Sequence, residues 1–183
     1  MAKSEFITRA TGSELELRSS GDGRTIHGIA VRFEQRDQIG DPEYGFVETF
    51  DKRAFDKTLR ERGAGRVRLL AHHDMRANPL GVTTVLRADA EGLYLEARVS
   101  KTQAGDEFLE LVRDGALTDL SIGFRPIADL WSRDRKFVRR AEVALHEISA
   151  VNLGALAGAT IAGVRSTSRS LNTSLALARL DLI

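Results

Sequence analysis

The sequence has no cysteine and no long apolar run, and each absence excludes a group of proteins. Without cysteine there is no disulfide bridge, no zinc–thiolate site and no cysteine nucleophile. No apolar run reaches the length of about 20 residues that spans a membrane. The N-terminal stretch Met1–Phe6 also lacks the apolar core of a signal peptide. We therefore expect a protein that is made in the cytoplasm and has no membrane as partner.

An excess of charge of one sign is missing as well. The formal net charge is +1, lysine occurs five times, and the arginines are scattered among acidic residues. A surface without a strong field favours neither nucleic acid nor an anionic membrane as partner. What the chain does have is 183 residues, of which 42% are hydrophobic and 29% charged, a composition that suits one soluble domain with a sizeable core.

Short stretches of β-prone and alternating apolar residues predict many strands. We expect them at 14–18, 25–33, 46–50, 67–74, 80–86, 92–99, 117–124, 127–131, 137–143 and 143–151. Two helices are expected, at 53–62 with Asp51 as N-cap and at 106–114, and the segment 34–45 is expected to be a loop. The pattern predicts a mainly β fold with a few helices (α+β), in the form of a barrel or closed sheet with helices outside it.

One serine lies in the middle of the apolar stretch Leu117–Phe124. Alternation along a strand places Ser121 on the face opposite Leu120 and Ile122, and on the same face as Gly123. Because glycine has no side chain, another group can approach the hydroxyl from that side. A serine in a strand is more often a surface residue, so a nucleophilic role requires a base and an acid elsewhere in the chain.

His73 and Glu147 are the candidate base and acid, each on a predicted strand. Alternation groups His73 with Val67, Leu69 and Ala71, and Glu147 with Leu145, Ser149 and Val151. His73 can also belong to a polar strand end, and a metal site is a further alternative, disfavoured because the adjacent His72 would point to the opposite face. Glu147 can also face solvent, but its strand has apolar residues on both faces, which indicates a covered carboxylate that needs a partner. Together the three side chains can form a Ser–His–carboxylate triad.

Several motifs follow one another in a specific order: Gly28–Phe33, Phe46–Phe50, Leu70–Asp74 with Pro79–Gly81, Gly92–Leu93, Gly115–Phe124 and Leu145–Val151. In order and spacing these segments, which cover roughly residues 26–165, resemble the HK97-type prohead protease family of tailed phages. The resemblance implies a serine endopeptidase with a fold similar to the herpesvirus assemblins, a β-barrel surrounded by helices.

Carried over residue by residue, the resemblance matches Ser121 with the family nucleophile, His73 with the base and Glu147 with the acid of the family's Glu-x-Ser segment. It implies no metal and no organic cofactor. The implied substrates are the scaffold domain of the major capsid protein and the protease itself, so self-association is expected. Cleavage would take place inside the procapsid, in the host cytoplasm.

Two positions leave alternatives open. The family often has asparagine where this chain has His72, so either histidine could be the base; the adjacent Asp74 favours His73. Assemblin-like proteases use a second histidine as third member, and His146 is next to Glu147, although alternation points the two to opposite faces. The segment Asn152–Leu156 also lacks the family's Pro-Ala-Asn pattern, so the loop in which oxyanion donors are expected can differ.

Two rival functions remain at this level. One is a catalytically inactive, structural or scaffold-associated procapsid protein of the same fold, and the other is a hydrolase of small esters. For the organisation of the chain, we expect a protease domain at 1–165. Residues 166–183 are expected to be a Ser/Thr/Arg-rich linker and a short amphipathic tail with leucines as its apolar positions.

Overall fold

The structure, a computed structural model, describes residues 5–10, 15–17 and 21–152, without the side chains of 15–17. The linker and tail predicted at 166–183 lie outside these residues, as does the segment 153–165. The strands are β1 (Ile7–Arg9), β2 (Leu15–Leu17), β3 (Thr25–Arg32), β4 (Asp37–Ile39), β5 (Phe46–Phe50), β6 (Arg68–Ala71), β7 (Gly81–Ala88), β8 (Gly92–Val99), β9 (Asp119–Trp131) and β10 (Phe137–Val151). The helices are α1 (Asp56–Glu61), α2 (Gln103–Arg113) and a short 3-10 turn, η1 (Ala64–Arg66).

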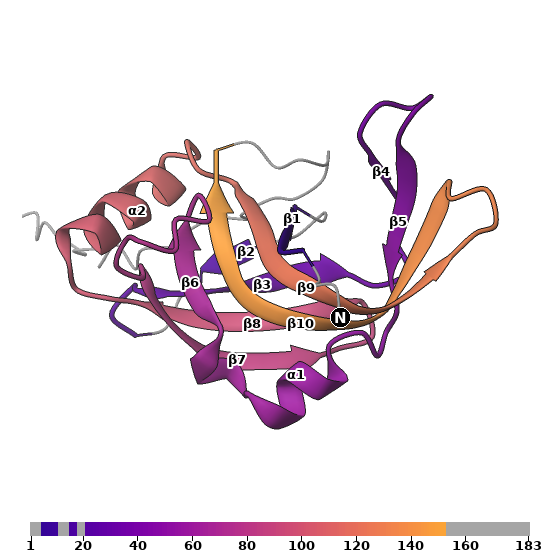
Figure 1. The fold of residues 1–183 in the computed structure, drawn as a ribbon. Helices are drawn as coiled ribbons and strands as arrows, with labels where there is room; N and C mark the ends of the chain where they lie inside the picture. Colours follow the sequence, from indigo (N-terminus) through magenta and orange to yellow (C-terminus); the bar gives the residue numbers. More distant parts are fainter. Residues whose placement is uncertain (1–4, 11–14, 18–20, 153–183) are drawn as a thin grey trace, which may run out of the picture.

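All these strands belong to one curved sheet (Figure 1). Its main order is β1-β9-β10-β6-β7-β8-β3-β2, and the pair β4–β5 branches off through the pairing of β5 with β10. The strands β1 and β2 lie at the two ends of this order, so the sheet is open, and its curvature gives it the form of a half-barrel (Figure 1). The long strands β9 and β10 run together through the molecule as one bent ribbon (Figure 1). The prediction of a mainly β fold with a few helices is therefore confirmed.

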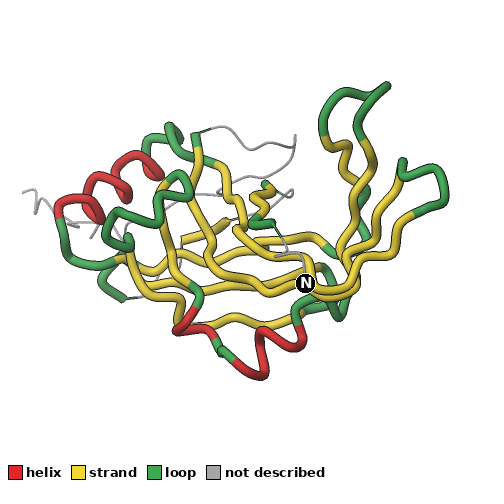
Figure 2. Tube along the Cα trace, in the orientation of Figure 1, coloured by secondary structure: helices red, strands yellow, loops and turns green. Residues whose placement is uncertain are grey.

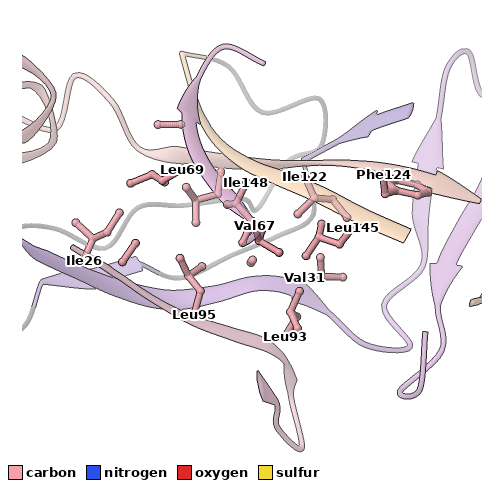
Figure 3. Packing of buried hydrophobic residues seen from close by; sticks show 14 of the residues in the cluster. Ile26, Val31, Val67, Leu69, Leu93, Leu95, Ile122, Phe124, Leu145 and Ile148 are labelled. Carbon is pink, nitrogen blue, oxygen red and sulfur yellow. The ribbon is translucent and has the colours of Figure 1, made fainter. Parts of the chain in front are cut away.

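The concave side of the sheet holds the hydrophobic core (Figure 3). Alternate residues of the strands point into it, as the period of two along a strand requires. Members of this core include Ile26, Val31, Leu69, Leu93, Leu95, Ile122, Phe124, Leu145 and Ile148. The helix α2 adds the apolar face formed by Phe108, Leu109 and Val112. The residues next to these inward-pointing positions of β9 and β10 point to the outer face of the sheet. The candidate site lies on this outer face.

Two arms extend from one end of the molecule, the hairpin β4–β5 and the far half of β9–β10 (Figure 2). A buried ionic network lies at their base. The Arg140 guanidinium donates to Glu48 (2.7 Å) and to Asp129 (2.5 Å), and Arg9 of β1 donates to the other oxygen of Glu48 (2.9 Å). The network thus connects β1, β5, β9 and β10.

Several predicted boundaries were wrong. The segment 34–45, predicted as a loop, contains β4, which pairs with β5. The helix expected from residue 53 begins at Asp56; Asp51 accepts a hydrogen bond from the Arg53 amide in the turn before it, not as the helix N-cap. The strands expected at 127–131 and 143–151 are parts of the longer β9 and β10, because pairing between the two continues through both segments. Within the described residues, no helix is long and apolar enough to cross a membrane.

Candidate active site

The pairing of β9 with β10 places four site residues in two facing pairs. Ser121 is the direct partner of Ser149, and Gly123 is the direct partner of Glu147. The core positions Leu120, Ile122 and Phe124 alternate with Ser121 and Gly123, as predicted, so this serine and glycine lie on the outer face of the sheet.

His73 reaches this face from a turn, not from a strand. The strand β6 ends at Ala71, and both His72 (φ 50°) and His73 (φ 59°) have left-handed backbone conformations. The Asp74 amide donates to the Ala71 carbonyl (3.0 Å), which closes a turn of the type I′ kind around the two histidines. In an uninterrupted strand, His73 would point into the core with Val67 and Leu69. The turn sends its ring to the outer face instead, which corrects the expectation that His73 lies on a strand.

The three predicted side chains form a continuous chain of hydrogen bonds. His73 Nε2 lies 2.8 Å from Ser121 Oγ, and His73 Nδ1 lies 2.6 Å from Glu147 Oε1. An ionised carboxylate can only accept, so Nδ1 carries the proton in this arrangement. The unprotonated Nε2 is then free to accept the Ser121 hydroxyl proton. The side chain of Glu147 is fully buried and that of His73 is 20% exposed, so the chain of bonds runs from the interior to an accessible ring.

A β-bulge sets the direction of Glu147. Leu145 pairs with Phe124 and Glu147 with Gly123, so His146 is an extra residue in β10 without a partner in β9. The bulge shifts the alternation: Leu145 and Ile148 are core residues, whereas Glu147 points outward. The expectation that Leu145 and Glu147 share a face was therefore wrong.

The two alternative histidines lie apart from this chain of bonds. The ring of His146 packs edge-on against Phe6, at 5.8 Å between centroids, and not against His73. Burial lowers the pKa of His146, and the charges of Arg62 and Arg125 lower it further. His72 lines a small cavity between β6 and α2, together with Leu80, Phe108 and Leu117.

Gly123 and Phe6 shape the surroundings of the acid. A Cβ atom at Gly123 would overlap Glu147 Oε1 and lie 2.5 Å from Phe6 Cζ. The Glu147 carboxylate therefore occupies the space in which a side chain of residue 123 would lie. Phe6, in the segment before β1, covers this space. The sequence signal for this space was the glycine two residues after the serine. Nothing in the sequence indicated that Phe6 would lie there, since it is far from both strands along the chain.

Ser149 is a polar site residue that the sequence reasoning did not single out. Its buried hydroxyl donates to Glu147 Oε2 (2.5 Å) and accepts a hydrogen bond from the His73 amide (3.1 Å). Its position two residues after Glu147 was the available signal. In the described part of the chain, no cluster of three or more His, Cys, Asp or Glu side chains is arranged to hold a metal ion. The loop expected to supply oxyanion donors lies almost wholly beyond Asn152, outside the described residues.

A mainly β half-barrel with a serine, a histidine and a carboxylate in hydrogen-bond contact has the arrangement that serine proteases use. The family model described as Caudovirus prohead serine protease matches residues 13–174. The chain belongs to this family, which confirms the resemblance found in the sequence. Among solved structures, the chain is similar to the bacteriophage T4 capsid assembly protease gp21. The TM-score is 0.58 at 16% identity, over 80% of this chain and 96% of that one. No curated protein sequence matches the chain.

Proposed function

We propose that this protein is an active serine endopeptidase of procapsid maturation, with Ser121 as nucleophile, His73 as general base and Glu147 as the acid that orients and stabilises it. The observation that carries the proposal is the unbroken chain of hydrogen bonds from Ser121 Oγ through the His73 ring to Glu147. The family membership supports the same reaction class.

Each residue has a defined task in the reaction. Ser121 Oγ attacks the carbonyl carbon of the scissile peptide bond while its proton moves to His73 Nε2. The buried Glu147 carboxylate stabilises the imidazolium that results. His73 then gives the proton to the leaving amine, and the acyl group stays on Ser121. A water molecule, deprotonated by the same nitrogen, then attacks the acyl carbonyl. The bond between the acyl carbon and Ser121 Oγ breaks, the proton on Nε2 returns to this oxygen, and the second product leaves as the carboxylic acid.

The substrates proposed are the scaffold domain of the major capsid protein and the protease itself, cleaved inside the procapsid in the host cytoplasm. This part of the proposal is supported by the family and by the likeness to a capsid assembly protease. A protease enclosed with its substrates meets them at high local concentration, and self-association, which brings one copy to another as substrate, is part of the proposal.

The test is co-expression of the chain with the major capsid protein of its phage, followed by intact-mass analysis of both. We expect defined cleavage products with the wild-type protein and full-length partners with Ser121→Ala, because loss of a triad nucleophile costs several orders of magnitude in rate. Thr58→Val is the matched control. This substitution removes the buried hydroxyl of Thr58 in α1, which is hydrogen-bonded to the β10 backbone at Val143 and Leu145. The variant should cleave normally.

Other outcomes would contradict this function or favour one of the two rival functions, the inactive structural protein and the hydrolase of small esters. Cleavage at the wild-type rate by Ser121→Ala contradicts the mechanism. A folded wild-type protein that assembles with capsid protein but cuts nothing would be the inactive structural protein. Hydrolysis of small esters without any cleavage of the capsid protein would favour the esterase.

A further inference from the structure

The hydroxyl of Ser149 joins the acid and the base of the site through a second connection. It lies on the strand next to Ser121, directly opposite that residue in the β9–β10 pair. The side chain is fully buried, so water does not compete for its hydrogen bonds. Both of its partners belong to the proposed catalytic set: the Glu147 carboxylate and the main chain of His73.

The direction of these two bonds follows from the chemistry of the groups. The His73 amide has a hydrogen and can only donate, so Ser149 Oγ accepts from it over 3.1 Å. The Ser149 hydrogen is then available to Glu147 Oε2, 2.5 Å away. Glu147 Oε1 accepts from the His73 ring at the same time. The carboxylate is thereby held at both oxygens, and the left-handed turn of His73 is held at its amide.

We propose that Ser149 is a positioning residue of the reaction, one that fixes the Glu147 carboxylate and the His73 backbone in a single geometry. The inference rests on the proposed function of the site. A left-handed conformation is uncommon for a residue other than glycine, although histidine adopts it more often than most. The bond from the His73 amide to Ser149 stabilises this conformation. Without the hydroxyl, the carboxylate can rotate and the turn can relax, and both movements take His73 Nε2 away from Ser121.

The kinetic test compares Ser149→Ala with the wild-type protein on a peptide that spans a cleavage junction identified by product mass. We expect kcat to fall by about 10- to 100-fold, because a displacement of about 1 Å in a catalytic group costs on the order of 100-fold in rate. We expect KM to stay within about twofold, since Ser149 is buried beneath the groups that meet the substrate. Ser149→Cys retains a weak donor and should give an intermediate kcat.

Thr58→Val is the matched control for stability. Thr58 Oγ1 accepts from the Leu145 amide and donates to the Val143 carbonyl, so its loss also removes two buried hydrogen bonds to β10. We expect a similar fall in melting temperature for the two variants but an unchanged kcat for Thr58→Val. A kcat for Ser149→Ala within twofold of wild type, or an equal loss in Thr58→Val, would overturn the proposal.

A measurement without turnover separates this inference from the proposed function. In the Ser121→Ala background, the proton on His73 Nδ1 can be observed by NMR in ¹⁵N-histidine-labelled protein. Adding Ser149→Ala should shift or broaden this resonance, whereas adding Thr58→Val should leave it in place. An unmoved resonance contradicts the positioning role even if the triad is correct. Cleavage by Ser121→Ala would instead show that the proposed function has failed, because it removes the nucleophile and leaves Ser149 intact.

Discussion

Gly123 and Glu147 face each other across β9 and β10, and the carboxylate of Glu147 fills the space in which a side chain at residue 123 would lie. The smallest residue on one strand thus makes room for the acid on the other. This relationship explains why the serine of the site is followed two positions later by glycine. It also makes the volume at residue 123 a sensitive test of where the acid lies.

Gly123→Ala is expected to lower kcat by at least about 100-fold, because the added methyl group must displace Glu147 from His73. Overpacking of this kind also costs about 1–3 kcal/mol in the free energy of unfolding. Peptide cleavage and urea unfolding measure the two effects. Gly65→Ala is the control, since a Cβ atom there meets nothing within 4 Å. Wild-type kcat in Gly123→Ala would mean that Glu147 does not act from this position.

The identity of the third member is tested by substitutions at neighbouring residues. Glu147→Gln keeps the shape of the side chain but removes the charge that stabilises the imidazolium, and kcat should fall by about 10³- to 10⁴-fold. His146→Ala should keep kcat within a few-fold of wild type, because its ring packs against Phe6 and not against His73. The reverse result, with His146→Ala inactive and Glu147→Gln active, would make His146 the third member.

His146 should also make the stability of the protein depend on pH. Burial and then the charges of Arg62 and Arg125 lower its pKa below 6.5, and Glu147 opposes this shift. Below about pH 6.5, the unfolded chain therefore binds a proton at this residue more readily than the folded protein does. The contribution to stability is complete above that pH and is lost as the pH falls toward the pKa in the folded state.

Urea unfolding of wild type and His146→Phe at pH 7.5 and pH 5.5 measures this contribution. Phenylalanine keeps an aromatic ring beside Phe6 but cannot titrate. The variant should lose less free energy of unfolding between the two pH values than the wild-type protein. An equal loss in both proteins would assign the pH dependence to other groups.

The buried network at the base of the arms is expected to be sensitive to the loss of one partner. Glu48→Gln removes one of the two carboxylates, Glu48 and Asp129, that pair with the guanidinium of Arg140, which is only 3% exposed. Breaking a buried pair in this way costs about 3–5 kcal/mol in the free energy of unfolding. Asp89→Asn, which breaks the much more exposed pair with Arg87, is the control and should cost less than about 1 kcal/mol. Similar losses in the two variants would argue against a structural role of the network.

The C-terminal segment gives a prediction that rests on composition. Residues 165–170 are all polar and are mostly serine and threonine with two arginines, and leucines follow at intervals up to residue 182. We expect a chain that ends at Arg165 to stay soluble and folded but to be packaged poorly. If the protease cleaves itself in this linker, the active protein from mature particles should lack the residues after about 160, whereas Ser121→Ala should keep its full length. Normal packaging of the shortened chain, or full-length active protein in particles, would make the segment an ordinary part of the domain.

The local pattern of the sequence determined a large part of the site. The outward direction of Ser121 follows from the apolar residues on either side of it, because the pleat of a strand alternates strictly between two faces. The motifs from Gly28 to Val151 were enough to indicate the family, and their strands make up most of the sheet. Ser121, His73 and Glu147 could be selected because each interrupts an apolar stretch and each matches a position in the family motifs.

Only the tertiary structure decided how these residues meet. Simple alternation would point His73 into the core and would group Glu147 with Leu145, yet a left-handed turn and a bulge redirect both. The turn is hydrogen-bonded to Ser149 and the bulge is set by the register with β9, so both involve contacts between segments far apart in the chain. The position of Phe6 over Glu147 also depends on a distant contact, because β1, which follows Phe6, pairs with the edge of β9. A sheet edge can be paired by any segment that reaches it. Periodicity reports the direction of a side chain within one strand, whereas register, bulges and turns depend on the partner strands.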